Sequence, residues 1–282
     1  MMMPGLLIIL VPALILGCTV SSGQQAREPT RELTVVKADG FSFSYSTEDF
    51  SEATIETVRA VTAQEIGDGI DEGISPEHVC VNLQDKRPLP ALDEGPRYFS
   101  PAYSFVCVIP LQDSSVEDFD EVYPSMTYYA TALQELLRER PDHVERRRGI
   151  PDFPPNNASP SIVSKYQYLE FRSGSGLMFL TQYSNEMQPN PVNNEELTLD
   201  FQGLTDDGQY YVAARLAITN PALPAGIDFT DDIDRDMPSF SYLRNEEKAL
   251  EEYSEDSFQP SLKSLKALLS SMQVDYGASN GR

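Results

Sequence analysis

Hydrophobic and polar residues alternate most regularly in the second half of the chain, between residues 165 and 218. In residues 197–202 a large hydrophobic residue stands at every odd position and a polar residue at every even position. A period of two is typical of a strand with one covered face and one face in water. The runs 166–171, 177–183 and 210–218 also have the composition of strands. The region therefore predicts four consecutive antiparallel strands.

Turn residues separate these predicted strands. Arg172–Gly176 contains two glycines, from which we expect the positive φ of a tight reversal. Thr205–Gly208 ends in Asp-Gly, a pair typical of hairpin turns.

The rest of the chain supplies further strands and the helices needed to cover the sheet. A sheet with one apolar face must bury it against another element. We therefore predict an α+β fold, an antiparallel sheet of hairpins and meanders covered by helices. Expected strands are Phe41–Tyr45, Thr54–Val61, His78–Leu83 and Ser104–Ile109, and expected helices are Ser125–Pro141, with Ser125 as its cap, Phe240–Tyr253 and Ser261–Met272.

The N-terminus has the pattern of an export signal. Leu6–Leu16 is apolar but would span only ~17 Å as a helix, too short for a bilayer core of ~30 Å. Ile15–Cys18 resembles the bacterial lipoprotein processing box, in which the cysteine sulfur carries the lipid. We expect lipid on Cys18 and an extracytoplasmic, membrane-anchored protein. The alternative is a plain signal peptide with an incidental cysteine, and Met1–Gly5 lacks the usual basic residues.

Length and charge limit the remaining possibilities. With 282 residues and 40% hydrophobic content, the chain is long enough for a substantial core. The expected organisation is a signal peptide over 1–17, a tether over 18–34, one domain over 35–276 and a short tail over 277–282. A net charge of −23 argues against binding to nucleic acid.

The two remaining cysteines lie in separate predicted strands. Disulfides persist outside the cytoplasm, so Cys80 and Cys107 are expected to form one if their strands are neighbours. The alternative is two buried thiols acting as small hydrophobic side chains. A metal site is not expected, because the chain has two histidines and neither stands at ligand spacing.

The sequence contains none of the common catalytic motifs. No nucleophile elbow, phosphate loop, HExxH pair or dinucleotide fingerprint is present, and no nucleophile is marked for His78 or His143. We expect no cofactor. Arg146–Arg148 are basic enough to meet phosphate or lipid headgroups, but such a run is more commonly a solvated loop. The acidic spacing at Asp232–Asp236 resembles the start of a calcium loop, yet Met237 replaces the essential glycine.

The best candidate for a ligand or partner site is the loop between the central hairpins. Tyr183 offers an amphipathic ring, and Asn185, Asn193 and Asn194 offer donors and acceptors. Loops held by a rigid sheet are common binding elements. The alternative is that Asn193 and Asn194 only form a turn and begin the next strand.

Three segments, Phe179–Tyr183, Asn193–Leu197 and Phe201–Val212, resemble a family of uncharacterised bacterial exported proteins and lipoproteins. The order of elements begins with the Phe41–Tyr45 strand, continues with a meander and closes with an apolar helix that ends in Ser270–Val274, and this order is similar to that of PsbP-like domains. That similarity implies an antiparallel sheet flanked by helices and a non-enzymatic accessory role. We therefore expect a lipid-anchored module that binds a protein or small-molecule partner. The alternatives are a hydrolase or transferase with a dispersed active site and a solute-binding component of a transporter.

Overall fold

A computed structural model shows the fold of most of the chain. Contacts divide the chain into two units, residues 1–30 and 31–282, and every element below belongs to the second. The structure describes residues 32–62, 74–86, 104–112, 116, 118–142, 150–151, 159–184, 190–226 and 239–275.

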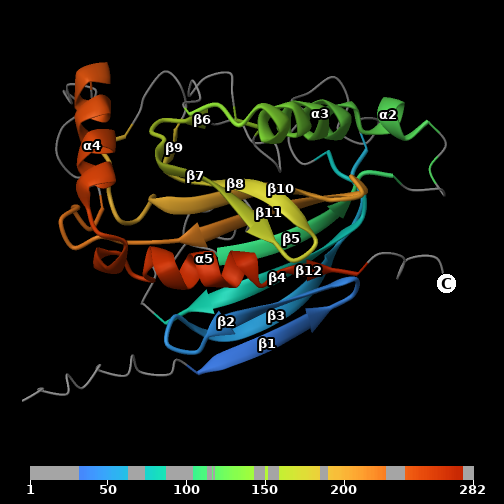
Figure 1. Ribbon diagram of the computed structural model, residues 1–282, viewed down its shortest axis with the longest axis horizontal. Coiled ribbons are helices and arrows are strands. Elements are labelled where there is room, and N and C mark those ends of the chain that lie inside the picture. Colours follow the sequence, from blue (N-terminus) through green and yellow to red (C-terminus); the bar gives the residue numbers. More distant parts are fainter. Residues whose placement is uncertain are drawn as a thin grey trace, which may run out of the picture. The chain divides into compact units, whose positions relative to one another are not determined.

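A seven-stranded sheet in which all neighbours are antiparallel forms the centre of this unit (Figure 1). Its strand order is β3-β4-β5-β11-β10-β8-β7, so the four strands predicted between residues 165 and 218 are consecutive neighbours. The strands are β3 (Phe50–Val58), β4 (His78–Asp85), β5 (Ser104–Pro110), β7 (Ser164–Phe171), β8 (Gly174–Thr181), β10 (Thr198–Thr205) and β11 (Tyr210–Ala217).

Smaller elements surround this sheet, and together they confirm the α+β class. No helix in the described part of the chain is long and apolar enough to cross a membrane. The second sheet contains β1 (Leu33–Ala38), β2 (Phe41–Ser46) and β12 (Gln273–Val274), and β6 (Ser159–Pro160) pairs with β9 (Tyr183–Ser184). The helices are α2 (Phe119–Val122), α3 (Pro124–Glu139), α4 (Phe240–Glu252), α5 (Leu262–Ser270) and the 3₁₀ turn η2 (Glu255–Ser257).

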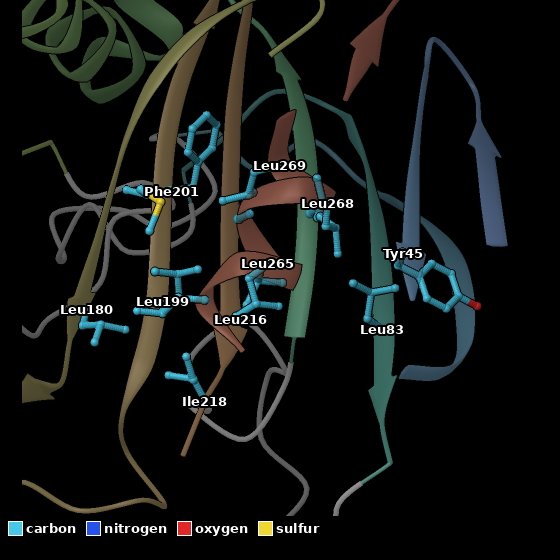
Figure 2. Close-up of a cluster of buried hydrophobic side chains, with 14 of the residues drawn as sticks. Tyr45, Leu83, Leu180, Leu199, Phe201, Leu216, Ile218, Leu265, Leu268 and Leu269 are labelled. Atoms are coloured by element: carbon cyan, nitrogen blue, oxygen red, sulfur yellow. The ribbon is translucent and has the colours of Figure 1, made fainter. Parts of the chain in front are cut away.

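One face of the central sheet packs against α5 and the smaller sheet. Figure 2 shows leucines of α5 lying over Leu199 of β10 and Leu216 of β11, with Tyr45 of β2 beside Leu83 of β4. Phe41 and Phe43 of β2 are buried in the same cluster. Four leucines of α5 are buried in this cluster: Leu262, Leu265, Leu268 and Leu269.

The opposite face packs against α3, which lies on the other side of the sheet from α5 (Figure 1). Met126, Leu133 and Leu136 of α3 join a second cluster with sheet residues such as Phe179 and Tyr211. The sheet is therefore covered on both faces. The sequence predicted one covered face and one face in water.

Most element boundaries lie close to the predicted ones. Ser261 caps α5 by accepting a hydrogen bond from the Ser264 amide, as expected of a serine before an apolar helical stripe. Two predictions were wrong in detail. Strand β3 runs from Phe50 to Val58 rather than from Thr54 to Val61, and α3 begins at Pro124 without a side-chain cap from Ser125.

The two predicted glycine turns have different outcomes. Gly208 has a φ of 67° and closes the β10–β11 hairpin, which confirms the Asp-Gly prediction. Gly174 and Gly176 lie inside β8 and do not have positive φ, so that explanation was wrong. They are needed because a Cβ at Gly174 would collide with the Leu204 carbonyl oxygen and a Cβ at Gly176 with the Phe201 ring.

Candidate functional site

The polar residues of β10 are buried on the α3-facing side of the sheet. Thr198, Asp200 and Gln202 are at most 1% exposed, so the prediction that this side is in water was wrong. Burial of polar side chains is favourable only when each finds a hydrogen-bond partner. The partners come from neighbouring strands. Tyr211 of β11, for example, donates to Gln202 Oε1 at 2.7 Å.

A buried ion pair stands at the centre of this polar row. Asp200 of β10 lies directly opposite Arg215 of β11, and their side chains are 1% and 5% exposed. Arg215 Nη2 and Nε both lie 3.2 Å from Asp200 Oδ2. The attraction between two such charges is offset by the free energy lost when they leave water, so the net contribution of the pair to stability is small.

Two hydroxyl groups complete the environment of the Asp200 carboxylate. Tyr183 of β9 donates to Oδ2 at 2.6 Å, and Thr198 donates to Oδ1 at 2.8 Å. The Arg215 guanidinium also lies 4.1 Å from the centroid of the Tyr183 ring, a cation–π arrangement. We call Thr198, Asp200, Arg215 and Tyr183 the Asp200 network. Tyr183 is its only partly exposed member, so the network holds one aromatic side chain in a fixed position near the surface.

The loop proposed as a binding element continues from Tyr183. Asn185 lies outside the described residues. Asn193 is fully buried, and its Oδ1 accepts hydrogen bonds from the backbone amides of Glu195 and Glu196 at 2.9 and 3.1 Å. This geometry is an Asx turn leading into β10.

Asn194 is likewise engaged within the protein. Its Nδ2 donates to the carbonyl oxygens of Asn220 and Leu223 at 3.1 and 3.0 Å, and its Oδ1 accepts from the Asn220 amide at 2.8 Å. The contacts of both asparagines favour the turn interpretation over ligand binding by their amide groups. Of the four residues predicted for this site, Tyr183 has the most suitable placement, because it joins the Asp200 network.

A carboxyl group beside this turn has a shifted pKa. Burial raises the pKa of Glu196, and hydrogen bonds from Asn190 and Asn193 oppose that shift. Asn190 Nδ2 lies 2.9 and 3.2 Å from the two carboxylate oxygens. The Glu196 carboxylate therefore helps to hold the turn together.

The predicted disulfide is present. Cys80 of β4 and Cys107 of β5 are direct cross-strand partners, with Cα atoms 4.1 Å apart and a sulfur–sulfur bond between them. Both are buried, at 0% and 1% exposure. The cysteine prediction is confirmed because its condition, that the two strands are neighbours, holds.

His78 lies on the same face of β4 as Cys80, two residues away. Its Nδ1 is 2.8 Å from the Pro76 carbonyl oxygen. Burial lowers the pKa of His78, and the bond to Pro76 and the charge of Glu56 oppose that shift. The ligand atoms of His78, Cys80 and Cys107 all lie within 4.8 Å of one another. Sequence spacing missed this cluster because Cys107 joins it only through strand pairing.

Other predicted features lie outside the described residues. These are the lipid-attachment residue Cys18, the arginine run Arg146–Arg148, His143, and the acidic spacing Asp232, Asp234 and Asp236.

Comparisons with family models, with curated proteins and with solved structures find no match to this chain. The resemblance to a family of exported proteins and to PsbP-like domains therefore stays a prediction.

Proposed function

We propose that this protein is a lipid-anchored, extracytoplasmic module that binds a partner in the cell envelope and performs no chemistry of its own. The observation that carries the proposal is the Cys80–Cys107 disulfide, buried between two strands of the central sheet. Structural disulfides persist in oxidising compartments and are rare in the cytosol. The compartment implied by the bond agrees with the one implied by the processing box at Cys18.

The chain between the anchor and the fold supports this arrangement. About 15 residues separate Cys18 from Leu33, where β1 begins. A flexible chain of that length has an r.m.s. reach of ~20 Å. The tether would keep the domain next to the membrane while allowing it to turn toward a partner.

Tyr183 is the contact residue we propose for that partner. The residue is partly exposed and its hydroxyl is fixed by Asp200, so little conformational entropy is lost when a partner covers it. Rigid tyrosines with one apolar face and one polar tip are frequent at interfaces.

Mass spectrometry of the mature protein tests the anchor. We expect an N-terminal Cys18 carrying acyl chains, and a Cys18→Ser variant that leaves the membrane fraction. Acid quenching of intact cells followed by alkylation in denaturant adds a second readout, in which Cys80 and Cys107 should stay unmodified because they are bridged. A mature N-terminus beyond Cys18 without acyl mass contradicts the anchor, and two alkylated cysteines contradict the compartment.

Chemical crosslinking in intact membranes tests the binding role. Tyr183→Ala should lose a crosslinked partner band that Tyr183→Phe retains, because the phenylalanine keeps the ring. Tyr128→Ala is the matched control, since Tyr128 is a tyrosine of α3 that is 69% exposed. Loss of the band in both alanine variants, or in neither, contradicts the assignment to Tyr183.

A further inference from the structure

Three groups that bind soft divalent metals come together at one place on the central sheet. His78 and Cys80 stand two residues apart on β4, so both side chains lie on the face that packs against α3. Cys107 lies directly opposite Cys80 on β5. The one imidazole nitrogen and the two sulfurs lie within 4.8 Å of one another.

We propose that reduction of the disulfide converts this cluster into a zinc site with His78, Cys80 and Cys107 as ligands. The oxidised protein has no such site, because zinc binds thiolates rather than disulfide sulfurs. Oxidation and zinc binding therefore exclude each other. The inference does not depend on the proposed anchor or partner.

The hydrogen bond of His78 leaves one ring nitrogen available for a metal. A carbonyl oxygen only accepts hydrogen bonds, so the 2.8 Å contact with Pro76 requires the proton to be on Nδ1. That proton leaves Nε2 with a free electron pair. Metal-binding histidines commonly donate their other ring nitrogen to a backbone carbonyl or carboxylate, which fixes the tautomer and the ring orientation.

The donor set and its charge favour zinc. One imidazole and two thiolates form a nitrogen–sulfur donor set of the kind that binds zinc, with bonds of ~2.0–2.3 Å. Two sulfurs bound to one zinc ion stand ~3.8 Å apart, a separation reached by small side-chain rotations from paired cross-strand positions. Glu56, directly opposite Cys80 on β3, adds a negative charge that acts on His78.

The redox step is thiol–disulfide exchange with a dithiol reductant. One thiolate of the reductant attacks a cysteine sulfur, the Cys80–Cys107 bond breaks, and a mixed disulfide forms. The second thiol of the reductant then displaces the other cysteine. The protein gains two electrons and two protons, and the reductant becomes a disulfide. Zinc then replaces the two thiol protons, which are released to solvent.

Cobalt(II) is the probe for the site, because its thiolate bands report sulfur ligation directly. The full chain carrying Cys18→Ser is used in detergent, so that Cys80 and Cys107 are its only thiols. After reduction with a phosphine and removal of the reductant without oxygen, we expect about one cobalt ion per chain with thiolate-to-metal bands that zinc abolishes. The oxidised protein should show none. Absence of the bands in the reduced protein overturns the proposal.

His78→Gln tests the histidine ligand, with His143→Gln as the matched control. We expect zinc affinity of the reduced protein to fall at least ~10-fold in His78→Gln and to stay unchanged in His143→Gln. Equal affinity in all three proteins overturns the role of His78.

Two measurements on the protein without a histidine substitution guard against loss of folding. Zinc should shift the ring-nitrogen resonances of His78 and leave those of His143 in place. The far-ultraviolet circular dichroism of the reduced, zinc-loaded protein should match that of the oxidised protein. Unmoved His78 resonances or an unfolded spectrum overturn the proposal, because the sheet would then not hold the ligands together.

Discussion

At the scale of single residues, a buried ion pair affects the stability of the central sheet. Asp200 and Arg215 are almost fully enclosed, and the carboxylate also accepts hydrogen bonds from Tyr183 and Thr198. Each ionised group is stable there only because the other is present. Removing one charge should therefore cost much more than removing both.

Asp200→Asn should lower the free energy of unfolding by about 3–5 kcal/mol, because it leaves the Arg215 charge buried without its carboxylate. Arg215→Met should cost less, since the carboxylate keeps the Tyr183 and Thr198 hydroxyls. The double variant Asp200→Asn with Arg215→Met should be more stable than Asp200→Asn alone. Urea unfolding of the four proteins measures this, and additive losses would contradict the coupling.

His78 gives the oxidised protein a pH dependence of stability. Burial lowers the pKa of His78 below its ordinary value of 6.5. As the pH falls below 6.5, the unfolded chain therefore binds a proton on His78 before the folded protein does. The stability linked to His78 is therefore complete above the unfolded pKa and is lost as the pH falls below it. The difference in urea midpoint between wild type and His78→Gln should shrink between about pH 8 and about pH 5. A difference that stays constant or grows would contradict this assignment.

At the scale of elements, Gly176 and Gly208 are required for different physical reasons. Gly176 lies in β8 where a Cβ would meet the Phe201 ring and the Gln202 carbonyl, whereas Gly208 has open space but a φ of 67°. Close packing and backbone conformation are separate reasons for glycine.

Gly176→Ala should lower the free energy of unfolding by about 2–3 kcal/mol, because the added methyl must displace buried neighbours. Gly208→Ala should cost about 1 kcal/mol, the conformational penalty alone. Thermal melts of the two variants compare these losses directly. The opposite order would show that β8 can move away from β10 at low cost.

Asn193 is the key residue of the turn before β10. Asn193→Ala should lower the free energy of unfolding by about 2 kcal/mol, because the amides of Glu195 and Glu196 lose their acceptor. Exposed Glu195→Gln is the control and should change stability little. A binding role for Asn193 would instead appear as an unchanged melt together with loss of the crosslinked partner.

The sequence predicted the strands better than what covers them. Alternation in residues 197–202 correctly assigned two faces to β10, but period alone does not reveal the environment of each face. The polar face of β10 is covered by α3, which lies far upstream in sequence. The ion-pair partner of Asp200, Arg215, is identified only from the pairing of β10 with β11. The disulfide was predictable because both cysteines stood in strand patterns. The position of His78 beside them required the register of β4 and β5.

At the scale of the whole molecule, the disulfide links the stability of the fold to its compartment. Cys80 and Cys107 are 27 residues apart, and closing a loop of that length stabilises a protein by about 3.5 kcal/mol through the entropy of the unfolded chain. That is a large fraction of the 5–15 kcal/mol that typically separates folded from unfolded domains. The protein should therefore be much less stable in a reducing environment without metal.

Cys80→Ala with Cys107→Ala should lower the free energy of unfolding by at least about 3.5 kcal/mol, because the unfolded chain regains its entropy and the buried sulfurs are lost. Reduction of the wild type without metal should lower the free energy of unfolding by a similar amount. The loss should be somewhat smaller than in the double variant, because the reduced protein keeps its buried sulfur atoms. Cys18→Ser should leave the urea midpoint unchanged, because the bridge involves only the other two cysteines. Zinc should raise the urea midpoint of the reduced wild type and leave that of the double alanine variant unchanged. That result would show that Cys80 and Cys107 also stabilise the fold as zinc-bound thiolates. Equal midpoints for wild type and the double alanine variant, both measured oxidised and metal-free, would contradict the stabilising role of the bridge.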